Sequence, residues 1–127
     1  MKKNIAKVTL VRNSQYGLYR RESDYNPNDE LLILEQYFGS ELGSDPSQVL
    51  IIRKYILKNE IGGNAIEADI VDGKIRLSLI YVPNLKEPVL TQEELLTLVD
   101  KWIELVAAKV DQIVITNDNG KFSIGTE

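Results

Sequence analysis

The sequence predicts a single α+β domain, in which a mainly antiparallel sheet packs against one long and one shorter helix. Three patterns predict this fold: a β-hairpin at about residues 64–82, a long helix at about 91–109 and a shorter helix at about 29–38. A chain of 127 residues, 43% of them hydrophobic, can form one hydrophobic core and is too short for two. We therefore take residues 1–127 as one domain.

The hairpin is the clearest local pattern. Apolar and polar residues alternate along 65–71 and again along 74–81, and Asp72-Gly73 separates the two arms. Both central positions of a two-residue type I′ turn need a positive φ, which this dipeptide adopts readily. The apolar side chains expected to share a face are Ile66, Ala68 and Ile70 on the first arm and Ile75, Leu77 and Leu79 on the second. Another element must cover this face.

The long helix has a defined start and an apolar face. Thr91 and Glu94 match a capping box, in which the Thr91 hydroxyl accepts a hydrogen bond from the Glu94 amide and the Glu94 carboxylate accepts one from the Thr91 amide. The apolar stripe consists of Leu95, Leu98, Val99, Trp102, Val106 and Val110. Trp102 is therefore expected in the core, and not on a surface that stacks nucleic-acid bases.

Strands are expected where β-branched residues cluster or alternate. These segments are 5–11, 112–116 and 121–124, and a turn separates the last two. Residues 13–28 are polar and turn-prone. A loop of about this length is uncommon in a small domain, and it indicates either a function or local disorder.

Two apolar runs are consistent with either a helix or a buried strand. For 29–38 we expect a helix, because a proline and early acidic residues suit a helix N-terminus. For 49–57 we expect a strand, because β-branched and aromatic residues are frequent there. Asp45-Pro46 could nevertheless cap a helix in this segment.

The chain contains neither histidine nor cysteine. The absence of histidine removes the commonest general base and the commonest metal ligand, and the absence of cysteine removes thiolate nucleophiles, disulfides and thiolate zinc sites. The remaining carboxylate, lysine, tyrosine and serine groups show no spacing that indicates a catalytic mechanism. We therefore expect no catalytic residues, no metal site and no cofactor.

Charge is distributed unevenly along the chain. The net charge is −4, but residues 1–21 contain six basic residues and no acidic one, so that 9 basic and 19 acidic residues remain in the rest. An acidic body repels nucleic-acid phosphates and favours a basic protein partner, although such carboxylates can also serve solubility alone. No apolar run approaches the roughly 20 residues of a membrane helix. We expect a cytoplasmic protein, because Lys7 and Arg12 interrupt what would be the apolar part of a signal peptide.

Glu67 and Asp69 form the carboxylate pair that could take part in hydrolysis or bind a metal ion. They share one face of the hairpin's first arm, so both could approach a cation or a water molecule. Alternation alone also places polar residues on the solvent face, and we favour that interpretation. Gly62-Gly63 could expose backbone amides to a phosphate, but it leads into a strand and not into a helix, so a turn is expected.

Tyr16, Tyr19, Arg20 and Arg21 form a candidate binding cluster in the long loop. Tyrosine and arginine contribute disproportionately to binding energy at protein interfaces, and together they can also grip single-stranded nucleic acid. The alternative is that the tyrosines pack onto the domain and the arginines pair with its carboxylates. Among binding functions we favour a protein interface, because the acidic body disfavours nucleic acid.

These observations predict a non-enzymatic protein-binding domain. Its character is similar to that of small acidic bacterial immunity proteins, which would bind and neutralise a basic toxin such as a nuclease, but no family motif is matched. The partner-binding residues expected are Tyr16, Tyr19, Arg20, Arg21, Glu67 and Asp69. A homodimeric structural or scaffold subunit is the alternative, and a small-ligand binder or a minimal carboxylate-dependent enzyme is the third possibility.

Overall fold

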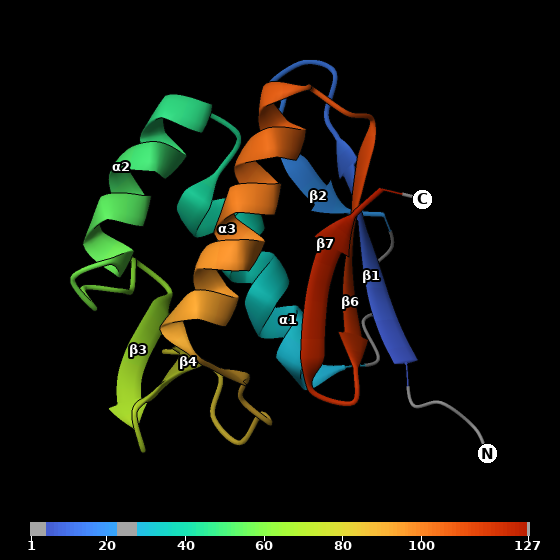
Figure 1. Cartoon of the computed structure of the whole chain (residues 1–127). Helices are drawn as coiled ribbons and strands as arrows, with labels where there is room; N and C mark the ends of the chain where they lie inside the picture. The colour runs from blue at the N-terminus through green and yellow to red at the C-terminus, as the bar shows by residue number, and fades with distance from the viewer. Residues whose placement is uncertain (1–4, 23–27, 127) are drawn as a thin grey trace.

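The computed structural model describes residues 5–22 and 28–126 (Figure 1). Its elements, in chain order, are β1 (Ile5–Arg12), β2 (Tyr19–Arg21), α1 (Asp29–Gln36), the π-helix η1 (Tyr37–Leu42), α2 (Pro46–Ile56), β3 (Ile66–Val71), β4 (Lys74–Leu79), β5 (Val89–Leu90), α3 (Gln92–Ala107), β6 (Gln112–Asp118) and β7 (Lys121–Gly125). The predicted α+β class with antiparallel sheet is confirmed.

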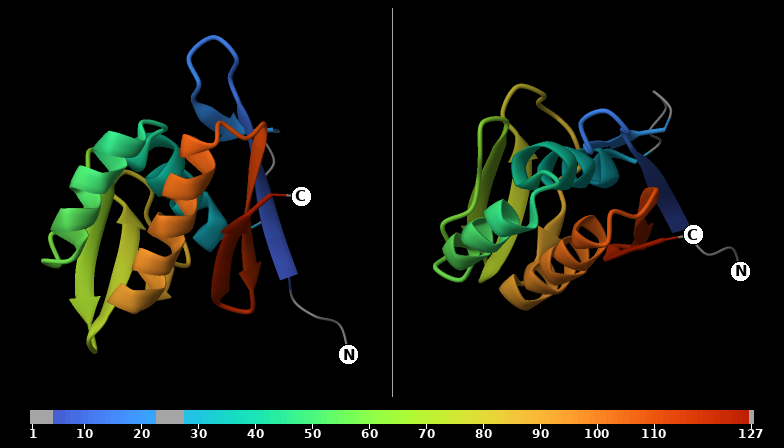
Figure 2. Two further views of the ribbon diagram at one scale, coloured as in Figure 1. Left: turned by 45° about the horizontal axis from the view of Figure 1, so that its top comes forward. Right: turned by 90° about the horizontal axis from the view of Figure 1, so that it is seen from above.

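The strands form two separate antiparallel sheets. The larger sheet has the order β2-β1-β6-β7, and the smaller has the order β3-β4-β5. Helices α1 and α3 lie between the two sheets, so that each sheet turns one face to the helical layer (Figure 2). The sequence did not predict this division of the strands, which places the β3–β4 hairpin in the smaller sheet.

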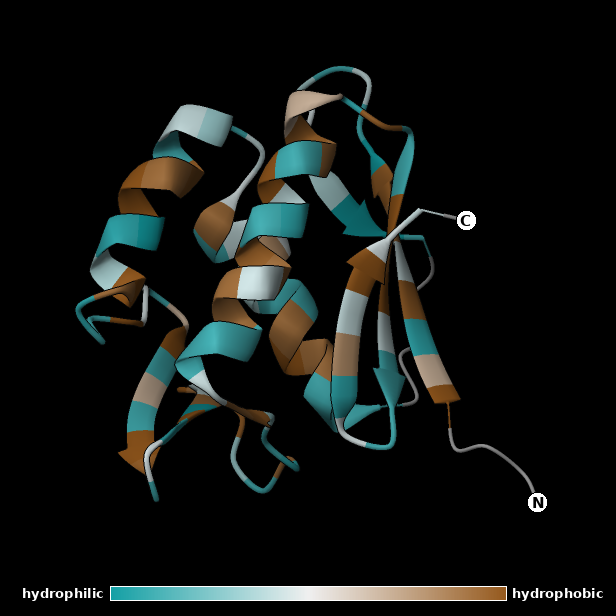
Figure 3. Cartoon of the chain, viewed as in Figure 1, coloured by the Kyte–Doolittle hydropathy of each residue, from teal (hydrophilic) through white to brown (hydrophobic). Residues whose placement is uncertain are grey.

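The core is centred on aromatic side chains from three distant parts of the chain. The ring of Trp102 on α3 lies 5.7 Å from that of Tyr19 and 5.4 Å from that of Phe38, measured between centroids. The side chain of Trp102 is 0% exposed, and its indole N–H donates a hydrogen bond to the Gly43 carbonyl oxygen at 2.8 Å. The predicted core position of Trp102 is confirmed, and hydrophobic residues of α3 face the interior (Figure 3).

The long helix begins as predicted. The Thr91 hydroxyl accepts a hydrogen bond from the Glu94 amide at 3.0 Å, and the Glu94 carboxylate accepts one from the Thr91 amide at 2.9 Å. The Gln92 side chain, in the first turn, donates hydrogen bonds to the carbonyl oxygens of Ile56 at 3.0 Å and Leu57 at 3.2 Å. The start of α3 therefore also holds the C-terminal end of α2.

The predicted hairpin is confirmed, with Val71 opposite Lys74 across a two-residue turn. Asp72 has a φ of 52° and Gly73 a φ of 75°, as a type I′ turn requires.

Gly73→Val is expected to lower the free energy of unfolding by about 1–2 kcal/mol, because a β-branched residue is strained at positive φ. Nothing lies within 4 Å of a Cβ built at this glycine, so the cost comes from the backbone alone. Gly125→Val is the matched control, since Gly125 also has open space around it but does not have a positive φ. Urea unfolding should separate the two variants; equal midpoints would contradict the turn assignment.

The strand predicted at 49–57 is wrong, because this segment belongs to helix α2. The Asp45 carboxylate accepts hydrogen bonds from the Ser47 amide at 3.0 Å and hydroxyl at 2.7 Å, and Pro46 occupies the first turn. Val49 and Ile56, two turns apart, are buried on one face. Capping and helical burial therefore outweigh the strand preference of the β-branched residues.

Two further segments differ in detail from the sequence prediction. The helix expected at 29–38 is confirmed as α1 but continues through η1 and ends at Gly43, where φ is 75°. Part of the loop expected at 13–28 forms β2, which pairs with β1. Residues 23–27 of that loop lie outside the described residues.

Candidate protein-binding groove

A groove of about 560 Å³ lies between α2 and the outer side of β3. Ile52 and Tyr55 line it from α2, and Ile66 and Ala68 line it from β3. Residues 60–63 form the connecting wall. The lining is thus mainly apolar.

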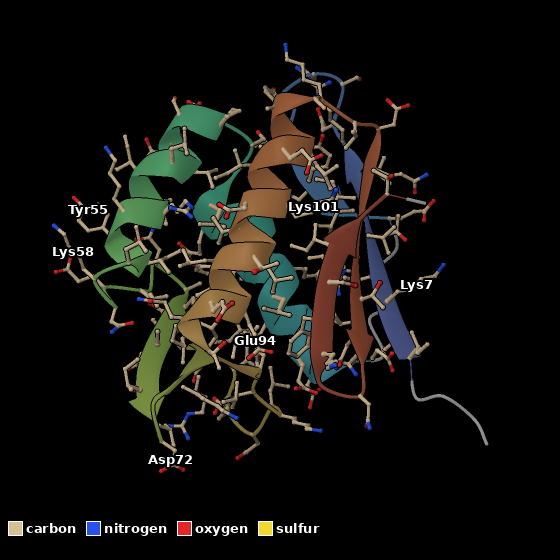
Figure 4. The ribbon with its side chains drawn as sticks, in the orientation of Figure 1. Lys7, Tyr55, Lys58, Asp72, Glu94 and Lys101 are labelled. Atoms are coloured by element: carbon tan, nitrogen blue, oxygen red, sulfur yellow. The ribbon has the colours of Figure 1, made fainter. Side chains whose placement is uncertain are left out.

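The apolar wall from α2 follows from how this helix packs. Its inner face contacts α3, and the Arg53 guanidinium joins the two helices through an ion pair with Asp100 at 2.6 Å. Tyr55 lies on the flank that α3 does not cover, is 50% exposed and extends outward together with Lys58 (Figure 4). Ile51, one turn earlier, is similarly exposed. An amphipathic helix normally buries such a flank.

The other wall is the edge strand of the smaller sheet. β3 pairs with β4 on one side, and on the other side an isolated bridge between Gly62 and Glu67 covers only its beginning. From Ala68 to Val71 no described strand pairs with the outer edge of β3. The side chain of Ile70 on this stretch is 55% exposed. Open edges of this kind can accept a further strand.

The charged residues that line the groove are both acidic. Glu60 and Glu67 are exposed, and neither is in an ion pair with another described residue. Glu67 is one of the residues that the sequence analysis selected. The groove therefore combines an apolar floor with negative charge.

Asp69 shares a face of β3 with Glu67 but has a basic partner, which Glu67 does not have among the described residues. The Asp69 carboxylate forms an ion pair with Arg76, its cross-strand partner, at 3.1 Å, and Arg76 also lies 3.5 Å from the Glu87 carboxylate. Asp69 is thus paired with a basic residue, and it does not line the groove. Among residues 5–22 and 28–126, no group of three or more acidic residues is arranged to hold a metal ion.

A carboxylate of the chain itself, that of Glu41, lies against the glycine pair beside the groove. Glu41 accepts hydrogen bonds from the Asn64 amide at 3.1 Å and the Ala65 amide at 2.8 Å. A Cβ on Gly63 would overlap the Glu41 carboxylate, so the close approach requires a glycine. Gly62-Gly63 is thus part of a turn, as expected, and the two amides that follow it are occupied. Sequence reasoning missed Glu41, because nothing in its spacing indicates a contact 23 residues away.

Gly63→Ala is expected to lower the free energy of unfolding by about 1–3 kcal/mol, because displacing Glu41 breaks two charge-assisted hydrogen bonds. Chemical denaturation of a double-mutant cycle with Glu41→Ala gives the control. In the Glu41→Ala background, Gly63→Ala should be nearly neutral. Additive effects would show that the glycine is needed for another reason.

Tyr37, on η1, lies near the charge of Glu41, and its side chain is buried, with 1% exposed. Its buried hydroxyl has no hydrogen-bond partner among the described residues. Burial, assisted by the negative charge of Glu41, raises the pKa of the Tyr37 phenol above its usual range. The hydroxyl therefore adds little to stability at neutral pH.

Tyr37→Phe is expected to leave the free energy of unfolding unchanged or to raise it by about 1 kcal/mol at pH 7. The wild type should also lose stability as pH rises above about 10, since the unfolded phenol ionises more readily than the folded one. Denaturant titrations at several alkaline pH values should show a smaller loss in the variant. Some loss should remain, because burial also raises the pKa of Tyr19. A variant that is destabilised at pH 7 would contradict the assignment.

The second predicted cluster does not form one exposed site. Tyr19 is only 2% exposed, and its hydroxyl donates a hydrogen bond to the Val110 carbonyl oxygen at 2.6 Å. The expectation of Tyr19 as a surface anchor is therefore wrong, because its ring completes the core. Tyr16, in contrast, is 70% exposed.

The two arginines of that cluster hold β2 against the helical layer. The Arg20 guanidinium donates a hydrogen bond to the Gly39 carbonyl oxygen at 3.2 Å, and Arg21 forms an ion pair with Glu35 at 3.1 Å. β2 belongs to the larger sheet, whereas Glu67 belongs to the smaller. The predicted partner-binding residues thus fall into two separate regions.

The α2–β3 groove can offer apolar contact, negative charge and an open strand edge to one ligand. These are the elements of a protein-recognition surface. In the described part of the chain, no helix combines the length and apolar character needed to cross a membrane. No protein-family model, curated protein or solved structure matches the chain.

Proposed function

We propose that this chain is a non-enzymatic protein-binding domain that holds a basic partner in the α2–β3 groove. The observation that carries the proposal is the groove itself, where the exposed Tyr55 side chain lies beside a strand edge and the lining charges are Glu60 and Glu67. Apolar groups clustered at the surface of a soluble domain commonly mark an interaction site. Carboxylates around them favour a cationic partner.

Within this proposal, inhibition of a basic enzyme is the favoured role. Enzymes that bind nucleic acids expose basic surfaces to phosphates, so an acidic domain that covers such a surface competes with the substrate. An immunity protein that neutralises a nuclease toxin acts in this way. The net charge of −4 supports electrostatic attraction between the two proteins.

Affinity capture from the native cells, with two matched tyrosine variants, tests the proposal. Tyr55 lines the groove, and Tyr16 is an exposed tyrosine on the larger sheet's side of the molecule. We expect the wild type to capture one stoichiometric basic protein. Calorimetry with that partner should show about 30-fold weaker binding for Tyr55→Ala, the equivalent of about 2 kcal/mol, and less than about 3-fold for Tyr16→Ala.

Three results would overturn the proposal. Equal affinity of Tyr55→Ala and the wild type would remove the groove from the interface. A self-associating protein with no foreign partner would favour the structural subunit. A stoichiometric small molecule or metal ion in the purified protein would favour the ligand binder or carboxylate-dependent enzyme.

The salt dependence of the captured complex gives a further check. Raising the ionic strength should slow association much more than it speeds dissociation, because long-range attraction acts on the encounter. Stopped-flow mixing measures both rates. An association rate that does not change with salt would contradict attraction by the acidic body.

A further inference from the structure

The backbone of β3 shows which residues can pair along its open edge. The Ile80 amide donates a hydrogen bond to the Ala65 carbonyl oxygen at 2.9 Å, which places this pair among the hydrogen-bonded pairs of the ladder. In an antiparallel ladder such pairs alternate, so Glu67, Asp69 and Val71 bond toward β4. Ala68 and Ile70 therefore turn their backbone groups away from β4; the Gly62–Glu67 bridge lies next to the Ala68 amide, and beyond it the edge is open.

The same alternation sorts the side chains of the edge into two chemical classes. Ala68 and Ile70 share the apolar face, and Ala68 lines the groove together with Ile52 and Tyr55 of α2. Glu67 and Asp69 lie on the opposite face. A strand that pairs with this edge would meet apolar groups on one side, and the Glu67 carboxylate and the Asp69–Arg76 ion pair on the other.

A second copy of the chain fits this edge poorly. If two copies of β3 paired about a two-fold axis at Ala68, Glu67 of each copy would face Asp69 of the other. Directly opposed like charges destabilise a strand pair, and natural edges use such charges to prevent self-association. In this register the edge disfavours a second copy, and the Glu67 carboxylate, which forms no ion pair with another described residue, favours a strand with basic residues.

We propose that the partner adds an extended segment antiparallel to β3, as a new edge strand of the smaller sheet, and that this segment alternates apolar and basic residues. The inference rests on the proposed function and specifies its mode of binding. The apolar residues of the segment contact Ala68, Ile70 and the flank of α2, and its basic residues lie beside Glu67. Antiparallel pairing continues the pattern of the existing sheet.

Synthetic peptides of about nine residues, which cover the open edge with some overhang, test the segment's chemistry. One alternates lysine with valine, and its control alternates glutamate with valine. We expect calorimetry to show binding of the lysine peptide only, with amide signals of residues 68–71 shifting in NMR spectra. Glu67→Lys should weaken this binding about tenfold, and Glu104→Lys should leave it unchanged. The latter makes the same change in net charge at an exposed position on α3.

N-methylated versions of the lysine peptide test the strand pairing itself, without altering the protein. In the antiparallel arrangement, the valine amides point to β3 and the lysine amides point away. Methylation of the valine amides should therefore abolish binding, whereas methylation of the lysine amides should reduce it by less than about threefold. Loss only on lysine methylation would overturn the antiparallel pairing, and binding that survives both would overturn strand addition.

These outcomes separate the two proposals. If Tyr55→Ala and Glu67→Lys weaken peptide binding but methylation of the valine amides does not, strand addition is wrong while the basic-partner function stands. If the glutamate peptide binds as well as the lysine peptide, the preference for a basic partner is wrong, and the inference fails with it.

Discussion

Trp102→Ala is expected to lower the free energy of unfolding by about 3 to 5 kcal/mol, because it removes the largest side chain of the core. The neighbouring rings of Tyr19 and Phe38 come from two separate elements, β2 and η1, and both pack against the indole that is removed. The substitution also removes the indole N–H that binds the Gly43 carbonyl oxygen. Equilibrium unfolding in urea measures the effect.

Two comparison variants separate the contributions of the indole ring, its hydrogen bond and the helix cap to the free energy of unfolding. Trp102→Phe keeps an aromatic ring but loses the hydrogen bond, and we expect an intermediate loss of stability. Thr91→Ala, which removes the cap of the same helix, should cost only about 0.5 to 2 kcal/mol. A Trp102→Ala variant no less stable than Thr91→Ala would contradict the core role of the indole.

Elements whose pattern is complete within a few residues could be predicted from the sequence. The Asp72-Gly73 turn and the Thr91 capping box need only nearby residues, and both are confirmed. Helix α2 was missed because its decisive contacts are distant. Val49 and Ile56 are buried in the core, and Gln92 on α3 holds the end of the helix. Local strand preference gave no sign of these contacts.

The division into two sheets could not be predicted for a similar reason. Alternation shows that a hairpin needs a cover for its apolar face, but it does not show whether other strands join its edges. Here β4 pairs with the short strand β5, and β1 pairs with β6 more than 100 residues later in the chain. No pattern in either segment identifies its partner.

The candidate site was predicted only in part. Glu67 was selected for its charge on a strand face, and it does line the groove. Tyr55 was missed because residues 49–57 were predicted as a strand. The exposed side of a helix, on which Tyr55 lies, was therefore not expected at this position. Tyr19 was selected because tyrosines are frequent at interfaces, yet the same aromatic area is equally suited to a core. Composition alone does not distinguish the two uses.

Tyr19→Ala is expected to lower the free energy of unfolding by about 3 kcal/mol, and its effect on partner binding should arise only through this loss of folding. The ring packs against Trp102, and its hydroxyl binds the Val110 carbonyl oxygen just after α3. Removing the side chain therefore loosens the contact between β2 and the end of the helix. Thermal and urea unfolding provide the measurement.

Tyr19→Phe separates the structural role from the binding role first expected of this residue. It keeps the ring and loses the hydrogen bond, so we expect a cost of about 1 kcal/mol and a protein that remains folded at room temperature. Because Tyr19 is buried away from the α2–β3 groove, the folded variant should bind the lysine–valine peptide with wild-type affinity. Tyr55→Ala should show the reverse, with stability close to wild type and weakened binding. If Tyr19→Phe instead speeds dissociation of a bound partner while remaining folded, the β2 region belongs to the interface and the groove is not the whole binding surface.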